Sequence, residues 1–278
     1  MDFITSIRWV VALKAEAISI IEQYKLVSYD HKGPFPIYKS KLQDVWLIVS
    51  GIGQVNSAAA SIYLFEKSTK FQNSVWINIG IAGFESSYGS IFKVDKIISH
   101  NNKKTFYPSA VVKNKIPYAT LLTVDEPDTN YSKDYMIDME GAAFYQTVSK
   151  ISSHELILIL KIISDNSRNE IKKINTINIQ NLFKEKLPFI KECLSGYLEI
   201  SNEECIRNRQ PKDFEILIST FHFTISQQYV LNTLIKKFNA LFPNKNLIDF
   251  IKNCKDSKSI INQLNTLIDQ NLVDWGKS

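Results

Sequence analysis

Short apolar runs alternate with segments of helical periodicity along the first two thirds of the chain. Runs rich in β-branched and aromatic residues predict buried strands, and apolar residues recurring every three or four positions predict helices. The predicted strands cover residues 7–13, 44–50, 74–79, 93–99, 118–124 and 156–163, and the predicted helices cover 14–24, 55–65 and 141–148. Strands that alternate with helices are typical of an α/β fold, with a parallel or mixed sheet covered on both faces.

The last third of the chain has a different pattern. Residues 201–211 are polar and end in Pro211, which indicates a boundary. After it, apolar stripes at helical spacing predict three or four helices, with Thr224 as a candidate N-cap. We therefore predict an α/β domain over residues 1–200 and a small all-α accessory region over residues 201–278.

Composition and charge exclude several classes of protein. Of the 278 residues, 45% are hydrophobic and 22% are charged, which is ordinary for a globular protein. The net charge of +5 is spread along the chain without a basic block, which argues against a nucleic-acid partner. The three cysteines and four histidines lack the spacing of a disulfide framework or a metal site, so we expect no metal and no cofactor. With no apolar stretch of membrane-spanning length and no evident signal peptide, we expect a cytoplasmic protein without a membrane partner.

Three of four motifs lie at the ends of predicted strands, where α/β sheets bind their ligands, and the fourth leads into a predicted helix and continues at the end of the strand over residues 156–163. They are Ala12-Leu13-Lys14-Ala15-Glu16, Ser50-Gly51-Ile52-Gly53, Asn78-Ile79-Gly80-Ile81-Ala82-Gly83, and Asp138-Met139-Glu140-Gly141-Ala142-Ala143 with Ser164-Asp165 further on. A glutamate at a strand-to-helix turn can serve as a general base, glycines let the backbone approach a ligand, and a carboxylate can accept two hydrogen bonds from a cis-diol. Taken singly, Glu16 and the glycine motif fit a solvated carboxylate and a plain strand-to-helix turn better than a site, and Glu140 fits a helix-start carboxylate as well as a ligand-binding one.

In this order the four motifs resemble those of the nucleoside phosphorylase and nucleosidase superfamily, most of all the 5′-methylthioadenosine/S-adenosylhomocysteine nucleosidases. The resemblance covers about residues 7–170. It implies a three-layer αβα fold with a central mixed β-sheet and a homo-oligomer. The C-terminal helices have no counterpart in that family, and docking of a protein partner is one possible role for them.

The resemblance also implies a role for each motif. Glu16 would activate the attacking water, and Asp165, oriented by Ser164, would protonate N7 of the leaving purine. Glu140 would accept hydrogen bonds from the ribose hydroxyls. The remaining predicted substrate-binding residues are Met139 under the sugar, Gly80 and Ile81 at the ribose, Leu13 near the 5′ substituent, Ile52, and Lys161, which stands where nucleosidases often carry an arginine.

Three features depart from the family pattern or discriminate within it. Ile81 replaces a serine, which removes a hydroxyl from the expected water and ribose site. Asn78 holds the position of a phosphate-binding arginine in the hexameric-type phosphorylases, which favours water over phosphate as the nucleophile. Only about 55 residues separate Gly83 from Asp138, so the base-binding loop must be rebuilt. Its candidates are Thr123-Val124-Asp125 and Phe106-Tyr107-Pro108, in which Phe106 or Tyr107 could stack on the base.

These features predict hydrolysis of the N-glycosidic bond of adenine nucleosides modified at the 5′ position, with release of adenine. Methylthioadenosine, adenosylhomocysteine and 5′-deoxyadenosine are the expected purine nucleoside substrates. An acid at Asp165 favours 6-aminopurines, because it can protonate N7 and accept a hydrogen bond from the amine. Two alternatives stay open: a purine nucleoside phosphorylase that uses phosphate, and a non-catalytic nucleoside-binding module with a partner-binding helical tail.

Overall fold

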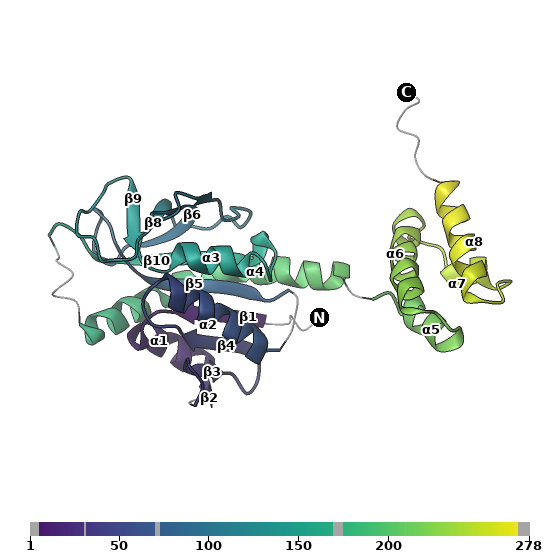
Figure 1. The fold of residues 1–278 in the computed structure, drawn as a ribbon, viewed down its shortest axis with the longest axis horizontal. Coiled ribbons are helices and arrows are strands. Elements are labelled where there is room, and N and C mark those ends of the chain that lie inside the picture. Colours follow the sequence, from purple (N-terminus) through teal and green to yellow (C-terminus); the bar gives the residue numbers. More distant parts are fainter. Residues whose placement is uncertain (1–5, 31, 70–72, 169–174, 209, 272–278) are drawn as a thin grey trace, which may run out of the picture. The chain divides into compact units, whose positions relative to one another are not determined.

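The computed structural model describes residues 6–30, 32–69, 73–168, 175–208 and 210–271. The chain divides into two compact units, residues 1–206 and 207–278. The first unit contains a large sheet with helices, and the described part of the second unit is made of helices (Figure 1).

Ten strands of the described residues form one mixed sheet around β5 (Val75–Gly83). β5 pairs in parallel with both β1 (Ser6–Val11) and β10 (Ile157–Asp165). Beyond β1 the sheet continues through β4 (Asp44–Val49), β3 (Ile37–Lys39) and β2 (Val27–Asp30). Beyond β10 it continues through β6 (Ile91–Ser99), which carries β7 (Thr105–Phe106), and then β8 (Tyr118–Thr123) and β9 (Tyr135–Asp138).

One half of this sheet closes on itself. β9 returns to the end of β5, where Ile137 pairs with Gly83. The strands β5, β10, β6, β8 and β9 are therefore joined in a ring of pairings. The closure brings the ends of β5, β9 and β10 together, although they are far apart in the sequence.

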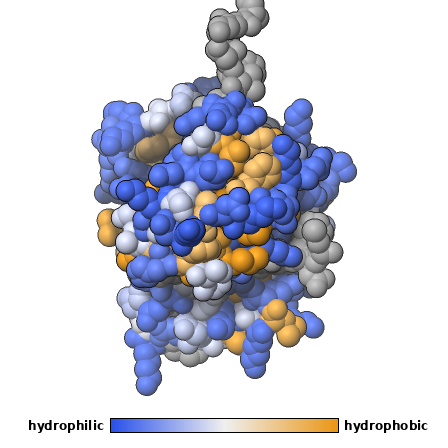
Figure 2. Space-filling model, turned by 90° about the vertical axis from the view of Figure 1, so that its right-hand side faces the viewer, coloured by the Kyte–Doolittle hydropathy of each residue, from blue (hydrophilic) through white to orange (hydrophobic). Residues whose placement is uncertain are grey.

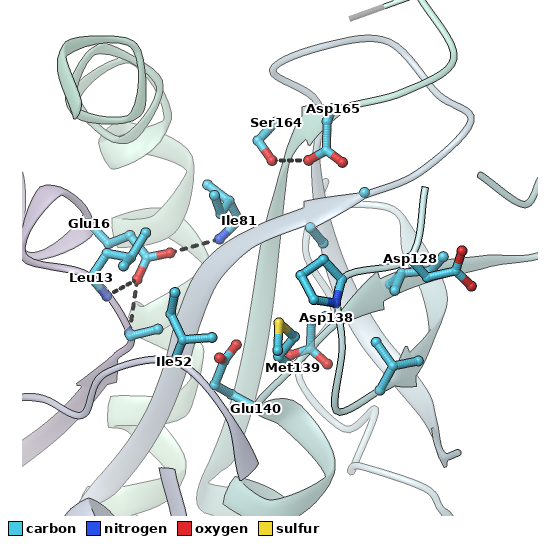
Figure 3. A pocket seen from close by; sticks show the side chains of 16 residues that line it. Leu13, Glu16, Ile52, Ile81, Asp128, Asp138, Met139, Glu140, Ser164 and Asp165 are labelled. Atoms are coloured by element: carbon cyan, nitrogen blue, oxygen red, sulfur yellow. Dashed lines mark hydrogen bonds between the residues drawn. The ribbon is translucent and has the colours of Figure 1, made fainter. Parts of the chain in front are cut away.

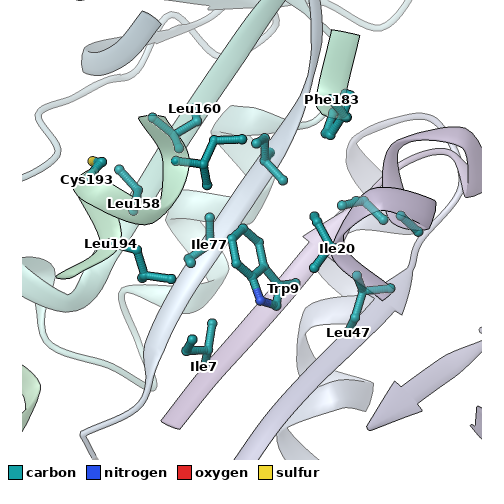
Figure 4. Packing of buried hydrophobic residues seen from close by; sticks show 14 of the residues in the cluster. Ile7, Trp9, Ile20, Leu47, Ile77, Leu158, Leu160, Phe183, Cys193 and Leu194 are labelled. Atoms are coloured by element: carbon teal, nitrogen blue, oxygen red, sulfur yellow. The ribbon is translucent and has the colours of Figure 1, made fainter. Parts of the chain in front are cut away.

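Helices cover both faces of the sheet. α1 (Lys14–Tyr24) and α4 (Thr176–Asn208) share one apolar core with Trp9 of β1, while α2 (Gln54–Lys67) and α3 (Gly141–Val148) share the other core with the next residue, Val10. Successive side chains of a strand point to opposite faces, so a continuous apolar strand supplies both cores. Figure 4 shows the first core, in which Trp9 lies among side chains from the neighbouring strands, α1 and α4. The predicted three-layer αβα fold with a central mixed sheet is confirmed.

The second unit has an apolar core of its own. Its helices are α5 (Lys212–Thr220), α6 (Ile225–Leu241), α7 (Leu247–Ile251) and α8 (Ser257–Asp269). Leu231, Phe238 and Leu264 are fully buried in this core. The predicted cap at Thr224 is confirmed, because its hydroxyl accepts a hydrogen bond from the Gln227 amide at 3.3 Å.

Some large apolar side chains of α5 and α6 stay at the surface. Ile225 and Tyr229 are about three-quarters exposed and border a groove that Phe214 and Ile218 also line. Figure 2 shows one face of the molecule, on which apolar side chains emerge between hydrophilic ones. None of the described helices combines the length and the apolar composition that spanning a bilayer requires.

Candidate active site

A pocket lies where the carboxyl ends of β1, β5 and β10 meet the loops after β4 and β8 and the start of α3 (Figure 3). Eight of the ten predicted site residues line it: Leu13, Glu16, Ile52, Ile81, Met139, Glu140, Ser164 and Asp165. The other two, Gly80 and Lys161, lie behind Glu16. A Cβ on Gly80 would stand 3.1 Å from Glu16 Oε1 and 3.5 Å from Lys161 Nζ. The sheet thus assembles in one place residues from motifs up to about 150 positions apart.

Glu16 is buried at the first turn of α1 and is held by backbone amides. Its Oε2 accepts hydrogen bonds from the amides of Ala12 and Leu13 at 2.9 and 2.8 Å, and its Oε1 accepts one from Ile81 at 3.0 Å. Burial raises the pKa of Glu16, against the opposing effect of these hydrogen bonds and of the charge on Lys161. Among the described residues Oε1 has a single donor, so it keeps an acceptor position for a further proton. The carboxylate is buried and held by three backbone amides, an arrangement that can serve a general base.

Glu140 closes the pocket from the start of α3. Its Oε1 accepts a hydrogen bond from the Gly53 amide at 2.7 Å. Gly53 has φ +102°, a backbone conformation that favours glycine, so the second glycine of the Ser-Gly-Ile-Gly motif turns its amide toward Glu140. Burial, and then the nearby charge of Asp138, raise the pKa of Glu140 to about 7.

Lys161 forms a buried ion pair beneath the pocket and does not line it. Its Nζ lies 2.7 Å from Asp138 Oδ2 and donates to Asn78 Oδ1 at 2.9 Å. Burial alone would lower the pKa of Lys161, but the charges of Asp138 and Glu140 outweigh it and the pKa is raised. Asp138 also accepts hydrogen bonds from the Thr123 hydroxyl at 2.6 Å and the Gly141 amide at 2.8 Å.

Asp138 is the charged residue whose role the motif analysis missed. A lysine in the middle of the most apolar strand was the available signal, because a buried cation requires a nearby anion. Asn78, discussed above as the replacement for a phosphate-binding arginine, is itself buried and bonded to this lysine.

Asp165 ends β10 in a closely packed position. Its Oδ1 accepts a hydrogen bond from the Ser164 hydroxyl at 2.5 Å, as the sequence-based role of Ser164 requires. A Cβ on Gly83 would stand 2.8 Å from Asp165 Oδ2 and 3.0 Å from Tyr131 Cε1. Glycine at position 83 therefore makes room both for the carboxylate and for the Tyr131 ring, which comes from the loop before β9.

Two segments were candidates for the rebuilt loop, residues 123–125 and residues 106–108. The pocket wall comes from the loop after β8, which contains the first of them. Val124, Pro127 and Asp128 line the pocket, in line with the candidate segment around Val124. Phe106 and Tyr107 do not line it: Phe106 packs 5.8 Å from the Tyr145 ring, and Tyr107 is exposed. Pro127 and Asp128 were not predicted, because nothing in their pattern distinguishes a pocket wall from an ordinary turn.

The described residues contain no group of three or more His, Cys, Asp or Glu side chains arranged to hold a metal ion. The carboxylates of the pocket are instead held by backbone amides, a hydroxyl and a lysine. Such an arrangement can accept protons and hydrogen bonds from a polar ligand.

At the level of sequence, no family model and no curated protein matches the chain. The similarity to solved structures is clear. The 5′-methylthioadenosine/S-adenosylhomocysteine nucleosidase of Campylobacter jejuni has 20% identity and a TM-score of 0.55, over 69% of this chain and 99% of that chain. The corresponding nucleosidase of Helicobacter pylori, bound to butyl-thio-DADMe-Immucillin-A, has 13% identity and a TM-score of 0.57, over 70% and 99% of the two chains.

A futalosine hydrolase mutant of Helicobacter pylori has 12% identity and a TM-score of 0.53, over 69% of this chain and 99% of that chain. Each neighbour is thus matched over nearly its whole length by about two thirds of this chain. At such low identity the likeness concerns the backbone. It shows that the chain has the nucleoside phosphorylase-like fold of the nucleosidases.

Proposed function

We propose that this protein is a purine nucleosidase that hydrolyses the N-glycosidic bond of adenine nucleosides modified at the 5′ position. The observation that carries the proposal is the convergence of Glu16, Glu140 and Asp165 on one pocket within a nucleosidase fold. Methylthioadenosine, adenosylhomocysteine and 5′-deoxyadenosine are the proposed substrates, and adenine is the proposed product.

In the proposed reaction each carboxyl group has a separate task. Breaking the glycosidic bond leaves a positive charge on the sugar and a negative charge on the base. Asp165 donates a proton to N7 of the base, which neutralises the leaving group. Glu16 accepts a proton from the attacking water through its remaining acceptor position on Oε1. Glu140 keeps Oε2 free to accept hydrogen bonds from the ribose diol, since Oε1 is held by Gly53.

Water is the proposed nucleophile because the pocket offers nothing that would hold phosphate. None of its described lining residues is Lys, Arg or His. Phosphate sites in proteins use an arginine fork or a lysine, and Lys161 is already engaged by Asp138. At position 81 the isoleucine side chain lines the pocket and offers the attacking water no hydroxyl. The Ile81 amide instead orients Glu16, the proposed general base.

Release of free base from a panel of nucleosides tests this function. The panel contains methylthioadenosine, adenosylhomocysteine, 5′-deoxyadenosine, adenosine and inosine, each with and without phosphate. We expect release of adenine at a rate that does not depend on phosphate. Phosphate-dependent release would instead identify a phosphorylase. Tight nucleoside binding with no release from any compound would identify a non-catalytic binding module.

The affinity for the ribose diol is expected to rise with pH through about 7. Below this pH the Glu140 carboxyl is protonated and loses acceptor capacity, and above it the ionised group accepts from both hydroxyls. At pH 6 about one tenth of Glu140 is ionised, so a C-nucleoside with an uncleavable sugar–base bond should bind roughly tenfold more weakly than at pH 8. Calorimetric titration at several pH values measures this change.

Two controls isolate the diol contribution. The 2′,3′-dideoxy analogue lacks both hydroxyls and should lose most of the pH dependence. A Glu140→Gln variant has no ionisable group at this position and should show a flat profile with the diol. If the ribose and dideoxy compounds followed the same pH profile in the unaltered protein, Glu140 would not be the diol acceptor.

The broader expectations from the sequence stay predictions. They are a homo-oligomer, a protein partner for the C-terminal helices and a cytoplasmic location. The groove between α5 and α6, with the exposed Ile225 and Tyr229 at its edge, is the surface at which to look for such a partner.

A further inference from the structure

A hydrogen-bonded junction lies beside the pocket, among residues that the proposed reaction does not use. The Asp125 carboxylate accepts a hydrogen bond from Gln54 Nε2 at 2.6 Å through Oδ1, and one from Asn101 Nδ2 through Oδ2. Gln54 is the first residue of α2, Asp125 belongs to the loop after β8, and Asn101 belongs to the turn between β6 and β7. One carboxylate therefore ties together three segments, although Gln54 and Asp125 are 71 positions apart in the sequence.

The junction joins two walls of the pocket. Ile52 lines one wall, just before the start of α2, and Val124 and Pro127 line the other, on either side of Asp125. Figure 3 shows Ile52 on one side of the pocket and Asp128, which follows Pro127, on the other. The Asp125 side chain is exposed and does not line the pocket. It can therefore fix the separation of the walls without occupying the space of a ligand.

Gln54 also directly follows the glycine that holds Glu140. The Gly53 amide donates to Glu140 Oε1 at 2.7 Å, and Gly53 is the N-cap of α2, without a side chain to cap the helix. Glycine gives the backbone wide conformational freedom, so the direction of this amide depends on what holds its neighbours. The Gln54 side chain supplies such a hold through its bond to Asp125.

We propose that Asp125 is a positioning residue, which acts through Gln54 and the Gly53 amide to hold Glu140 in place for the ribose diol. A site that is set before the ligand arrives loses less affinity to the ordering of its loops. This inference rests on the proposed function, because it takes Glu140 to be the diol acceptor. It deepens that function by naming a residue outside the pocket on which the hold on the sugar depends.

Loss of the tie should weaken binding of the ribose more than binding of the base. Without the side chain of Asp125 or of Gln54, the Gly53 amide is free to turn and Glu140 loses its fixed orientation. A single hydrogen bond of this kind changes an equilibrium by about two- to tenfold. We therefore expect the affinity for a ribose compound, relative to its 2′,3′-dideoxy analogue, to fall about two- to tenfold in Asp125→Ala and in Gln54→Ala.

Calorimetric titration with the C-nucleoside 9-deazaadenosine and with its 2′,3′-dideoxy analogue measures this ratio. A ratio taken within one variant is insensitive to a general loss of affinity. The double variant Gln54→Ala with Asp125→Ala should fall no further than Asp125→Ala alone, since the two side chains act as one tie. Asp134→Ala is the matched control, because it removes the same side chain from an exposed position on the same loop, outside the pocket, and it should leave the ratio unchanged.

The pH profile separates positioning from the charge of Asp125. Burial raises the pKa of Glu140 and the Gly53 amide opposes that rise, so turning the amide away should move the rise of diol affinity to higher pH in both variants. Loss of the negative charge of Asp125 would by itself do the opposite, because a nearby anion raises the pKa of a carboxyl group. Three other charges act on Glu140, and both variants leave them in place: Asp138, Lys161 and Glu16.

The possible outcomes separate this inference from the proposed function. An unchanged ratio in Asp125→Ala and Gln54→Ala would overturn the positioning role, and so would a shift of the profile to lower pH or an equal fall in Asp134→Ala. The expected fall without any adenine release from methylthioadenosine would support the positioning role while refuting the nucleosidase activity. Adenine release with an unchanged ratio would support the nucleosidase and refute the positioning role.

Discussion

Replacement of Asp165 by asparagine is expected to slow adenine release by about 10²–10⁴-fold, the usual contribution of a general acid. The amide keeps the shape of the side chain, and its oxygen can still accept the hydrogen bond from Ser164. It has no acidic proton to transfer to N7 of the leaving base. Binding of an uncleaved C-nucleoside should change by much less than the rate, because most contacts of the pocket persist.

The measurement compares the rate constant for adenine release with the dissociation constant of the C-nucleoside. Asp134→Asn is the matched control, since it makes the same chemical change at an exposed position outside the pocket. A near-normal rate in Asp165→Asn would remove Asp165 from the proposed role of acid. An equal loss of rate and of binding would indicate instead that Asp165 serves to bind the base.

The sequence predicted much of the framework of the site because most of the motifs lie at the ends of predicted strands. Apolar runs such as residues 156–163 predict strands by composition alone, and a parallel arrangement places their carboxyl ends at one edge. Glu16 and Asp165 could therefore be expected near one another without knowledge of the exact topology, whereas the place of Glu140 was expected from the resemblance of its motif. The structure places all three on one pocket.

The pairing of Asp138 with Lys161 depends on a feature that local patterns do not contain. β9 has four residues, too few for a reliable period, and it returns to β5 through the single pair Ile137 and Gly83. This closure brings the end of β9 beside β10, where Lys161 lies. A long-range contact of this kind is set by the whole sheet, so neither motif predicts it alone.

Among the other elements that were not predicted, β2 and α4 have clear physical reasons. β2 lies at the edge of the sheet and is largely exposed, so it lacks the apolar alternation that marks a strand. α4 contains Pro188 in its interior, a residue that ordinarily interrupts a helix. Burial of side chains such as Phe183 and Tyr197 against the sheet stabilises α4 through tertiary packing, which outweighs local propensity.

Replacement of Lys161 by methionine is expected to lower the free energy of unfolding by about 3–5 kcal/mol, the usual cost of removing one partner of a buried ion pair. Asp138 would keep its hydrogen bonds from Thr123 and Gly141 but lose its counter-charge at full burial. Denaturant titration measures the loss. Lys93→Met is the control, because Lys93 is equally buried. Its Nζ donates to the Val112 carbonyl at 2.9 Å and lies over the rings of two tyrosines. No carboxylate among the described residues is bonded to it.

The double variant Lys161→Met with Asp138→Asn distinguishes charge from packing. Asparagine can still accept from Thr123 and Gly141, and no unpaired charge remains, so we expect the double variant to regain more than half of the lost stability. Equal losses in the single and double variants would show that packing of the lysine chain dominates.

The Lys161→Met variant alone should also change the pH dependence at the site. The charge of Lys161 lowers the pKa of Glu140, so its removal should shift the rise of diol affinity to higher pH. A change of stability without this shift would separate the structural role of the pair from its effect on Glu140.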